Sequence, residues 1–248
     1  MANREPKVKV QHLTKKFGDL LVLNDLNFEV QEGEFLCIVG PTGCGKTTFL
    51  NSLTRLYEPT AGDILVNGIP VNPKTQNISY IFQEYSSFPW LTVEQNIRFG
   101  LEIKKVSKAE ADANVEEMLD IVGLTKFRDY YPSQLSISML QRVAIARAFA
   151  TKPELLLMDE PYGQLDIDLR FKLEDELIKL WKKTGTTVLF ITHNIEEAVY
   201  LSQKIMVLTN KPTSVKTILD NPLPLPRDVV SEEFVALRNQ VTDLIKWW

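Results

Sequence analysis

The sequence has no long apolar segment. Hydrophobic residues make up 44% of its 248 residues, but no apolar run approaches the length of about 18 residues that marks a membrane span. The opening residues, Met1–Lys7, also lack the apolar core of a secretory signal. We therefore expect a cytosolic protein that reaches a membrane only through a partner.

Cysteine and net charge are scarce as well. The two cysteines, Cys37 and Cys44, lie on an expected strand and in the loop after it, so we expect no disulfide framework and a reducing compartment. A net charge of −4 provides no general attraction for nucleic acid. The composition is otherwise that of an ordinary globular protein, and 248 residues suffice for one large α/β domain or two small ones.

Residues 40–47, Gly-Pro-Thr-Gly-Cys-Gly-Lys-Thr, match the phosphate-loop pattern G-x-x-x-x-G-K-[ST]. They follow the apolar run Phe35–Val39, an expected buried strand, and precede an expected helix over Thr47–Leu56. In this setting, backbone N–H groups and the helix N-terminus surround phosphate oxygens. We predict a nucleoside triphosphate site in which Lys46 reaches the β- and γ-phosphates and Thr47 ligates Mg²⁺. The expected binding residues of this loop are Gly40, Pro41, Thr42, Gly43, Cys44, Gly45, Lys46, Thr47 and Thr48.

Two further apolar runs end in side chains suited to phosphate chemistry. Leu155–Met158 leads into Asp159 and Glu160, the Walker B arrangement, and a later run ends in His193. Asp159 is expected to hold Mg²⁺ through water, and Glu160 to act as general base on the attacking water. A neutral His193 would bind the γ-phosphate and orient that water. The alternatives are a solvent-facing acidic turn and a structural histidine.

The remaining patterns predict an α/β fold. Fully apolar runs of strand length are typical of a parallel sheet that is covered on both faces. Apolar residues at helical spacing, with polar residues between them, predict amphipathic helices. The expected strands are Leu20–Leu23, Leu26–Val30, Gly62–Gly68 and Val188–Ile191, and the expected helices cover 108–122, Gln134–Ala150 and Phe234–Trp248.

Taken in order, these motifs resemble the ATP-binding subunit of an ABC transporter over essentially the whole chain. The resemblance implies that Phe17 stacks on adenine and that Gln83 senses Mg²⁺ and water. It also implies that Ser136, in the signature segment, contacts ATP held by a second subunit, and it places Gln164–Asp166 in the D-loop. The expected catalytic residues are Lys46, Gln83, Glu160 and His193, and the expected Mg²⁺ ligands are Thr47, Gln83 and Asp159.

The resemblance also implies a domain plan. We expect a P-loop NTPase core with a mainly parallel sheet, and an antiparallel β subdomain built from the first ~70 residues. A helical insert is expected over residues 85–150. The nucleotide-binding domain would cover 6–220, and 221–248 would form a C-terminal extension that ends in an amphipathic helix.

A narrower resemblance is to the nitrate, sulfonate, taurine and bicarbonate importers. It rests on the segments 83–96, with its Pro89-Trp90, 159–163 and 192–198. It implies an ATPase that drives uptake of a small, anionic solute from the cytoplasmic face of the membrane. Its partners would be a second ATP-binding subunit, integral membrane subunits and, indirectly, a substrate-binding protein, with no nucleic acid. Residues 85–90 would touch a membrane subunit; alternatively, Phe88 and Trp90 fill the domain's own core.

The signature segment departs from the family pattern. The usual Leu-Ser-Gly-Gly is replaced by Leu135-Ser136-Ile137-Ser138, so both glycines that allow close backbone approach to phosphate are absent. Two hypotheses remain: an active ATPase subunit whose helix adjusts slightly, and a low-turnover subunit that works in an asymmetric heterodimer. Gln164 in the D-loop is a second departure, of open effect.

Overall fold

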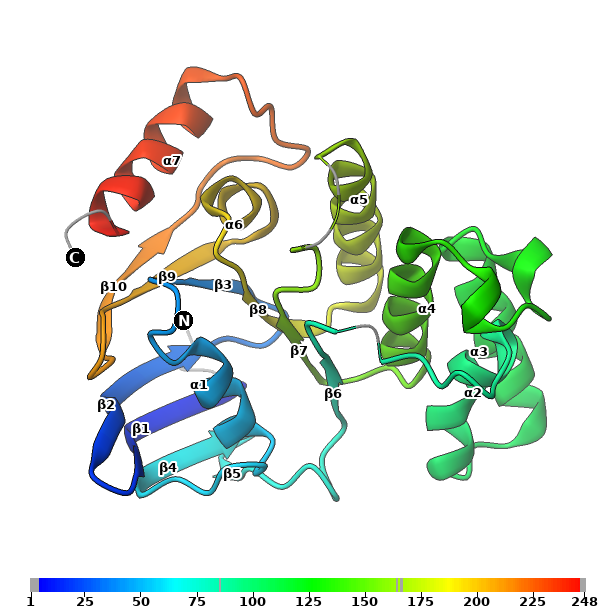
Figure 1. Ribbon diagram of the computed structural model, residues 1–248, viewed down its shortest axis with the longest axis horizontal. Coiled ribbons are helices and arrows are strands. Elements are labelled where there is room, and N and C mark those ends of the chain that lie inside the picture. The colour runs from blue at the N-terminus through cyan, green and yellow to red at the C-terminus, as the bar shows by residue number, and fades with distance from the viewer. Residues whose placement is uncertain (1–4, 85, 164, 166, 246–248) are drawn as a thin grey trace. The chain divides into compact units, whose positions relative to one another are not determined.

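The computed structural model describes residues 5–84, 86–163, 165 and 167–245. They form two compact units: one contains the described residues up to Gln76 and from Thr187 onward, and the other is Asn77–Thr186. Each unit is described by itself (Figure 1). No helix in the described ranges is both long enough and apolar enough to cross a bilayer.

The first unit contains an antiparallel sheet with the strand order β2-β1-β4-β5. This confirms the antiparallel sheet expected from the first ~70 residues. The two strands expected on either side of Asn24 and Asp25 are instead one, because register shifts against β1 absorb the extra residues and Asp25 adopts a φ of 52°. The strands are β1 (Val8–Phe17), β2 (Leu20–Val30), β4 (Ala61–Val66) and β5 (Ile69–Pro70).

The same unit contains the parallel strands around the phosphate loop. β3 (Phe35–Val39) lies between β8 (Thr187–Ile191) and β9 (Lys204–Leu208) and is parallel to both. β10 (Val215–Asp220) adds an antiparallel edge. Every residue of β3 and β8 is buried, as the uninterrupted apolar runs predicted.

Three helices pack in this unit. α6 (Ile195–Leu201) and α7 (Glu232–Ile245) lie together near β3 and β9, and α1 (Lys46–Leu53) lies on the opposite side (Figure 1). The predicted end of α1 at Leu56 is wrong: Arg55 adopts a φ of 57°, which ends the helix. α7 confirms the expected C-terminal helix and packs through the buried Phe234 and Val241.

The second unit pairs two parallel strands, β6 (Ile78–Ile81) and β7 (Leu155–Asp159), and carries four helices. The apolar stripe expected over 108–122 is buried at Val115, Met118, Leu119 and Val122. The helices are α2 (Val93–Ile103), α3 (Lys108–Ile121), α4 (Ile137–Ala150) and α5 (Ile167–Thr184).

The start of α4 differs from the sequence expectation. The helix was expected to begin at Gln134, but Pro132–Gln134 forms a short 3₁₀ turn and α4 begins at Ile137. Ser136 caps the helix, because its hydroxyl accepts a hydrogen bond from the Met139 N–H. A second 3₁₀ turn covers Thr125–Phe127.

Asn96 of α2 organises the chain that enters that helix. Its side chain is fully buried, and its Oδ1 accepts a hydrogen bond from the Phe88 N–H at 2.8 Å. Its amide nitrogen donates to the backbone carbonyls of Phe88 at 3.2 Å, Leu91 at 3.0 Å and Thr92 at 2.9 Å. One buried side chain therefore satisfies both the donor and the acceptors of this turn.

We expect Asn96→Ala to destabilise the protein by about 1–3 kcal/mol, because the Phe88 N–H and the Leu91 carbonyl lose the partner that Asn96 supplies, while the carbonyls of Phe88 and Thr92 keep backbone donors. The measurement is the urea midpoint of unfolding, with Asn239→Ala as control because Asn239 is exposed on α7. Equal midpoints for Asn96→Ala and the wild type would contradict this prediction.

Candidate functional site

The phosphate loop joins β3 to α1 through glycines in conformations that other residues avoid. Gly43 has a φ of 73°, and Gly45, the residue before α1, has a φ of 125°. A Cβ at Gly45 would also lie 3.0 Å from Val22 Cγ1 and 3.2 Å from Leu23 Cδ2. The loop therefore needs glycine at position 45 both for its backbone angle and for its contact with β2.

Lys46 folds back over this loop. Its side chain is 6% exposed, and its ammonium donates to the carbonyl oxygens of Gly40 at 3.0 Å and Pro41 at 3.3 Å. Thr47 is exposed on the first turn of α1. The cation and the helix N-terminus thus lie at one place, as an anion site requires.

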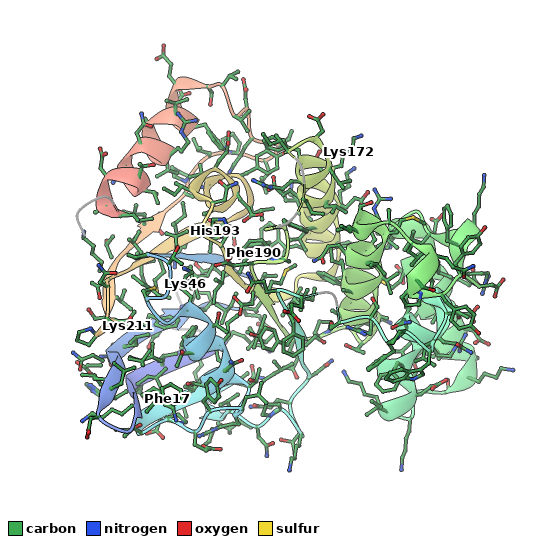
Figure 2. All side chains as sticks on the ribbon, viewed as in Figure 1. Phe17, Lys46, Lys172, Phe190, His193 and Lys211 are labelled. Atoms are coloured by element: carbon green, nitrogen blue, oxygen red, sulfur yellow. The ribbon has the colours of Figure 1, made fainter. Side chains whose placement is uncertain are left out.

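Cys44 is a structural part of the loop. Burial raises the pKa of its thiol, although the nearby charges of Lys46 and Lys211 oppose this shift. The Thr213 hydroxyl donates to the Cys44 carbonyl oxygen and ties the loop to the segment before β10. Figure 2 labels Lys46 and Lys211 in this unit. A buried thiol with a raised pKa is a poor nucleophile.

His193 follows β8 at the same sheet edge as the phosphate loop. β3 and β8 are parallel with Ile38 opposite Ile191, and the Thr192 N–H donates to the Ile38 carbonyl at 3.2 Å. His193 comes next in the chain and is exposed (Figure 2). Asn194 then caps α6 by accepting hydrogen bonds from the first N–H groups of that helix. The structure therefore brings Lys46 and His193 to one edge.

Phe17 ends β1 and is 42% exposed, so one aromatic surface faces solvent. Tyr57 packs edge-on against it, with ring centroids 5.2 Å apart. The Lys15 ammonium lies 4.8 Å from the Phe17 ring centroid. Neither neighbour of Phe17 was predicted from the sequence. Lys15 was detectable from the two-residue period of a strand, whereas Tyr57 follows α1 and no local pattern linked it to Phe17.

In the second unit, Asp159 ends β7, Glu160 follows it directly, and Gln83 lies two residues beyond the end of β6. β6 and β7 are parallel with Ile81 opposite Met158, so these polar residues lie at one edge of the pair. Asp159 is 3% exposed, and its Oδ2 accepts a hydrogen bond from the Tyr80 hydroxyl at 3.3 Å. Gln83 is exposed. The role of Tyr80 was missed, since a tyrosine inside a strand gives no sequence signal of such a contact.

Glu160 has an unusual backbone. Its φ is 45°, a left-handed conformation that residues with a side chain seldom adopt. The Glu160 carbonyl accepts a hydrogen bond from the Gly163 N–H at 3.2 Å, which forms the turn after β7. Strained backbone at a polar residue directly after a buried strand is a frequent mark of a functional site.

The signature segment keeps its helix cap despite the missing glycines. Ser136 is exposed at the start of α4, and its hydroxyl lies 2.9 Å from the Ser138 hydroxyl, within hydrogen-bond distance. Ile137 is 50% exposed and does not enter the core. The substituted residues therefore leave the helix start in place, but Ser138 gives Ser136 a partner that glycine would not. The D-loop positions Gln164 and Asp166, and Tyr85, lie outside the described residues.

The protein-family comparison matches the ABC transporter model to residues 23–163 of this chain. The chain belongs to the ABC transporter family. An uncharacterised ABC transporter ATP-binding protein of Methanocaldococcus jannaschii is 44% identical over 97% of this chain and 91% of its own length. The aliphatic sulfonates import ATP-binding protein SsuB of Bacillus cereus is 40% identical over 93% of this chain and 91% of its own length.

Solved structures confirm the ATPase fold. CbiO1 of Clostridium perfringens, part of the ABC transporter complex CbiONQ, superposes with a TM-score of 0.79 at 25% identity and covers 93% of this chain and 92% of its own. A dimeric ATP-binding cassette with bound ADP and Pi superposes with a TM-score of 0.76 at 32% identity, over 86% of this chain and 98% of its own. The chain is thus an ABC ATPase subunit that binds and hydrolyses ATP.

We expect Gly45→Ala to lower ATP affinity at least about tenfold, because Ala at a φ of 125° costs on the order of 1–3 kcal/mol and contacts Val22. The measurement is titration with a fluorescent ATP analogue. Gly185→Ala is the control, since Gly185 also has a positive φ, 65°, but has open space around it and lies outside the loop. Equal affinities for the two variants would contradict the prediction.

Proposed function

We propose that this chain is one of two ATP-binding subunits of an importer, and that its ATP hydrolysis drives uptake of a small, anionic solute through separate membrane subunits. The observation that carries this proposal is the similarity to the aliphatic sulfonate import protein over 93% of the chain. Segment 83–96, with Pro89-Trp90, adds support from sequence. The subunit would sit at the cytoplasmic face of the membrane and meet a substrate-binding protein only indirectly.

The proposed domain plan follows the same resemblance. Residues 6–220 would form the nucleotide-binding domain, with its helical part over about 85–150, and 221–248 would form an extension. The packing of Phe234 and Val241 of α7 supports an extension that is attached to the first unit.

ATP would be held mainly by the first unit. We propose that residues 40–48 enclose its phosphates, that Lys46 pairs with the β- and γ-phosphates, and that adenine stacks on Phe17. Two observations support these roles: the Lys46 ammonium already points into the loop, and a partly exposed Phe17 ring is held in place by Tyr57. The ammonium would exchange its bonds to loop carbonyls for charged phosphate oxygens.

The oxygen donors suit Mg²⁺. Thr47, Asp159 and Gln83 would hold it, and bound Mg²⁺ supplies charge neutralisation on the phosphates. Mg²⁺ keeps several waters and needs only one or two protein carboxylates beside substrate phosphates.

Hydrolysis would use three side chains on the attacking water. Glu160 would accept the water's proton, His193 would bind the γ-phosphate and orient the water, and Gln83 would sense its position. The left-handed backbone of Glu160 supports a role that needs a fixed carboxylate direction. Ser136 and the N-terminus of α4 would meet the γ-phosphate held by the other subunit.

Residues 85–90 would meet a membrane subunit, and we call the described part of this stretch, 86–90, the coupling segment. Trp90 is 69% exposed, so the alternative that it fills the domain's own core is wrong. Phe88 is half-buried and lies against Phe99, with ring centroids 4.5 Å apart, and beside Trp90 at 5.6 Å. An exposed tryptophan on an anchored aromatic base is suited to a protein interface.

The signature substitutions bear on turnover. We favour an active subunit over the low-turnover alternative, because Lys46, Glu160 and His193 are all present and α4 keeps its capped start. The Ser138 hydroxyl lies 2.9 Å from that of Ser136 and would slow the site by competing with phosphate for the Ser136 hydroxyl.

Glu160→Gln should retain ATP binding and lose about 10²–10⁴-fold in hydrolysis, because an amide cannot accept the water's proton. Steady-state ATPase of the assembled transporter and fluorescent-ATP binding measure the two effects. Glu102→Gln, at an exposed glutamate of α2, serves as the control. Unchanged turnover in Glu160→Gln would remove that residue from the catalytic role.

Trp90→Ala should weaken assembly with the membrane subunits and reduce their effect on ATPase rate, by about tenfold for an anchor residue worth more than 1 kcal/mol. Co-purification yield and the ATPase rate of the complex are the measurements. Leu56→Ala controls for the loss of an exposed apolar side chain elsewhere, since Leu56 is 61% exposed. Full assembly and rate in the Trp90 variant would count against this surface.

The double substitution Ile137→Gly with Ser138→Gly should speed ATP hydrolysis, because backbone donors then approach the γ-phosphate more closely. In a complex with two copies of this chain, both sites gain, and we expect an increase of about tenfold or more in steady-state ATPase. In a heterodimer, only the site built from the partner's phosphate loop gains, provided that the partner has a catalytic glutamate. No change in a demonstrated homodimer would show that the substituted signature is already competent.

A further inference from the structure

Arg147, on the third turn of α4, donates two hydrogen bonds to the coupling segment. Its Nη1 donates to the Ser86 carbonyl oxygen at 2.8 Å, and its Nη2 donates to the Ser86 hydroxyl at 2.7 Å. Its guanidinium carbon lies 5.1 Å from the centroid of the Phe88 ring, a cation–π geometry. One side chain therefore fixes both the backbone and the aromatic base of this segment.

The stability of the fold does not explain why an arginine occupies position 147. Arg147 is half-buried, and burial lowers its pKa, which shows that the charge is partly withdrawn from water. No carboxylate of the described ranges pairs with it; its partners there are Ser86 and Phe88. A buried charge without a countercharge weighs against folding, and an apolar side chain of similar volume would pack at lower cost.

The coupling segment is held from two helices. Asn96 of α2 bonds to the backbone N–H and carbonyl of Phe88. Arg147 of α4 bonds to the carbonyl and the hydroxyl of Ser86.

α4 joins Arg147 to the end of the helix that faces ATP in our proposal. Arg147 lies eleven residues beyond Ser136 on one unbroken helix, a distance of about 16 Å along its axis. Arg142 of the same helix pairs with Glu176 of α5 at 3.1 Å. Because α4 is rigid, a movement of its Ser136 end would also move Arg147 and the coupling segment bonded to it.

We propose that Arg147 is a positioning residue for coupling: it holds Ser86 and Phe88 against α4, so that movement of this helix on ATP engagement reaches the surface that meets the membrane subunit. This inference rests on the proposed function of the coupling segment. It assigns no chemistry to Arg147, which acts through Ser86 and Phe88.

Arg147→Lys is the sharpest test. Lysine keeps the charge, but its single ammonium cannot make two parallel bonds and stack on a ring. The readout is the ATPase rate of the assembled transporter divided by that of the isolated chain. We expect this ratio to fall about tenfold or more, because small displacements of a positioned segment often cause losses of this size. The ATPase rate of the isolated chain should stay within about twofold of wild type, since the substitution touches no catalytic group. An unchanged ratio would overturn the proposal.

Arg98→Lys is the matched control. Arg98 lies on α2 of the same unit, is 19% exposed at its side chain, and bonds to Glu94 at 2.9 Å and Asp112 at 2.6 Å. It does not touch the coupling segment in any described contact, so its substitution should leave the ratio unchanged at a similar thermal midpoint. An equal fall of the ratio in both variants would also overturn the role of Arg147.

Variants on the other side of the contact keep the test decisive if Arg147→Lys folds poorly. Ser86→Ala removes the hydroxyl that accepts from Arg147 Nη2, and Phe88→Leu removes the ring beneath the guanidinium, while the bond to the Ser86 carbonyl remains; each variant should lower the ratio. Ser86→Ala should add no further loss in the Arg147→Lys background, because the two residues act together. Additive losses, or no loss in the Ser86 and Phe88 variants, would contradict the proposal. If Trp90→Ala lowers the ratio and these variants do not, the proposed interface stands and Arg147 has no part in it.

Discussion

The parallel pairing of β3 with β8 is the constraint on which the phosphate-binding side of the protein depends. It places the C-terminal ends of both strands at one edge. The phosphate loop follows β3 there, and His193 follows β8. Both strands are fully buried, so this edge cannot shift without disrupting the core. The loops that carry the chemistry are thereby attached to the most rigid part of the unit, which is the usual way in which a scaffold fixes a site.

Two residues of the candidate functional site, Gly45 and Glu160, have positive φ angles that residues with a Cβ seldom adopt. Gly45 supports α1 at a φ of 125°, and Glu160 follows β7 at a φ of 45°. These conformations cost stability, and they persist because buried strands on one side and a helix or turn on the other leave the chain no alternative. The phosphate loop is curved around Lys46, whose ammonium donates to two carbonyls of the loop.

In the second unit, α4 has a comparable organising part. Its capped N-terminus presents Ser136, and Arg142 ties its second turn to α5. Its third turn holds Ser86 through Arg147. Since a helix is stiff along its axis, α4 links Ser136, which we propose faces ATP, to the coupling segment, which we propose meets a membrane subunit. The loss of the signature glycines changes the surface of that element, while its cap stays intact.

The sequence by itself determined the motif positions and most of the core strands, because a phosphate loop and a buried strand are local patterns of spacing and hydrophobicity. It also predicted the α/β class, the antiparallel N-terminal sheet and the family. Its errors were local boundaries: the continuity of β2 and the ends of α1 and α4, where single residues such as Arg55 and Ser136 decide the backbone. Only the tertiary structure showed three contacts. The Tyr57 ring packs edge-on against Phe17, the Tyr80 hydroxyl donates to Asp159, and Arg147 donates to Ser86. Each of these contacts joins residues distant in sequence, so it is created by packing, and no local pattern encodes it.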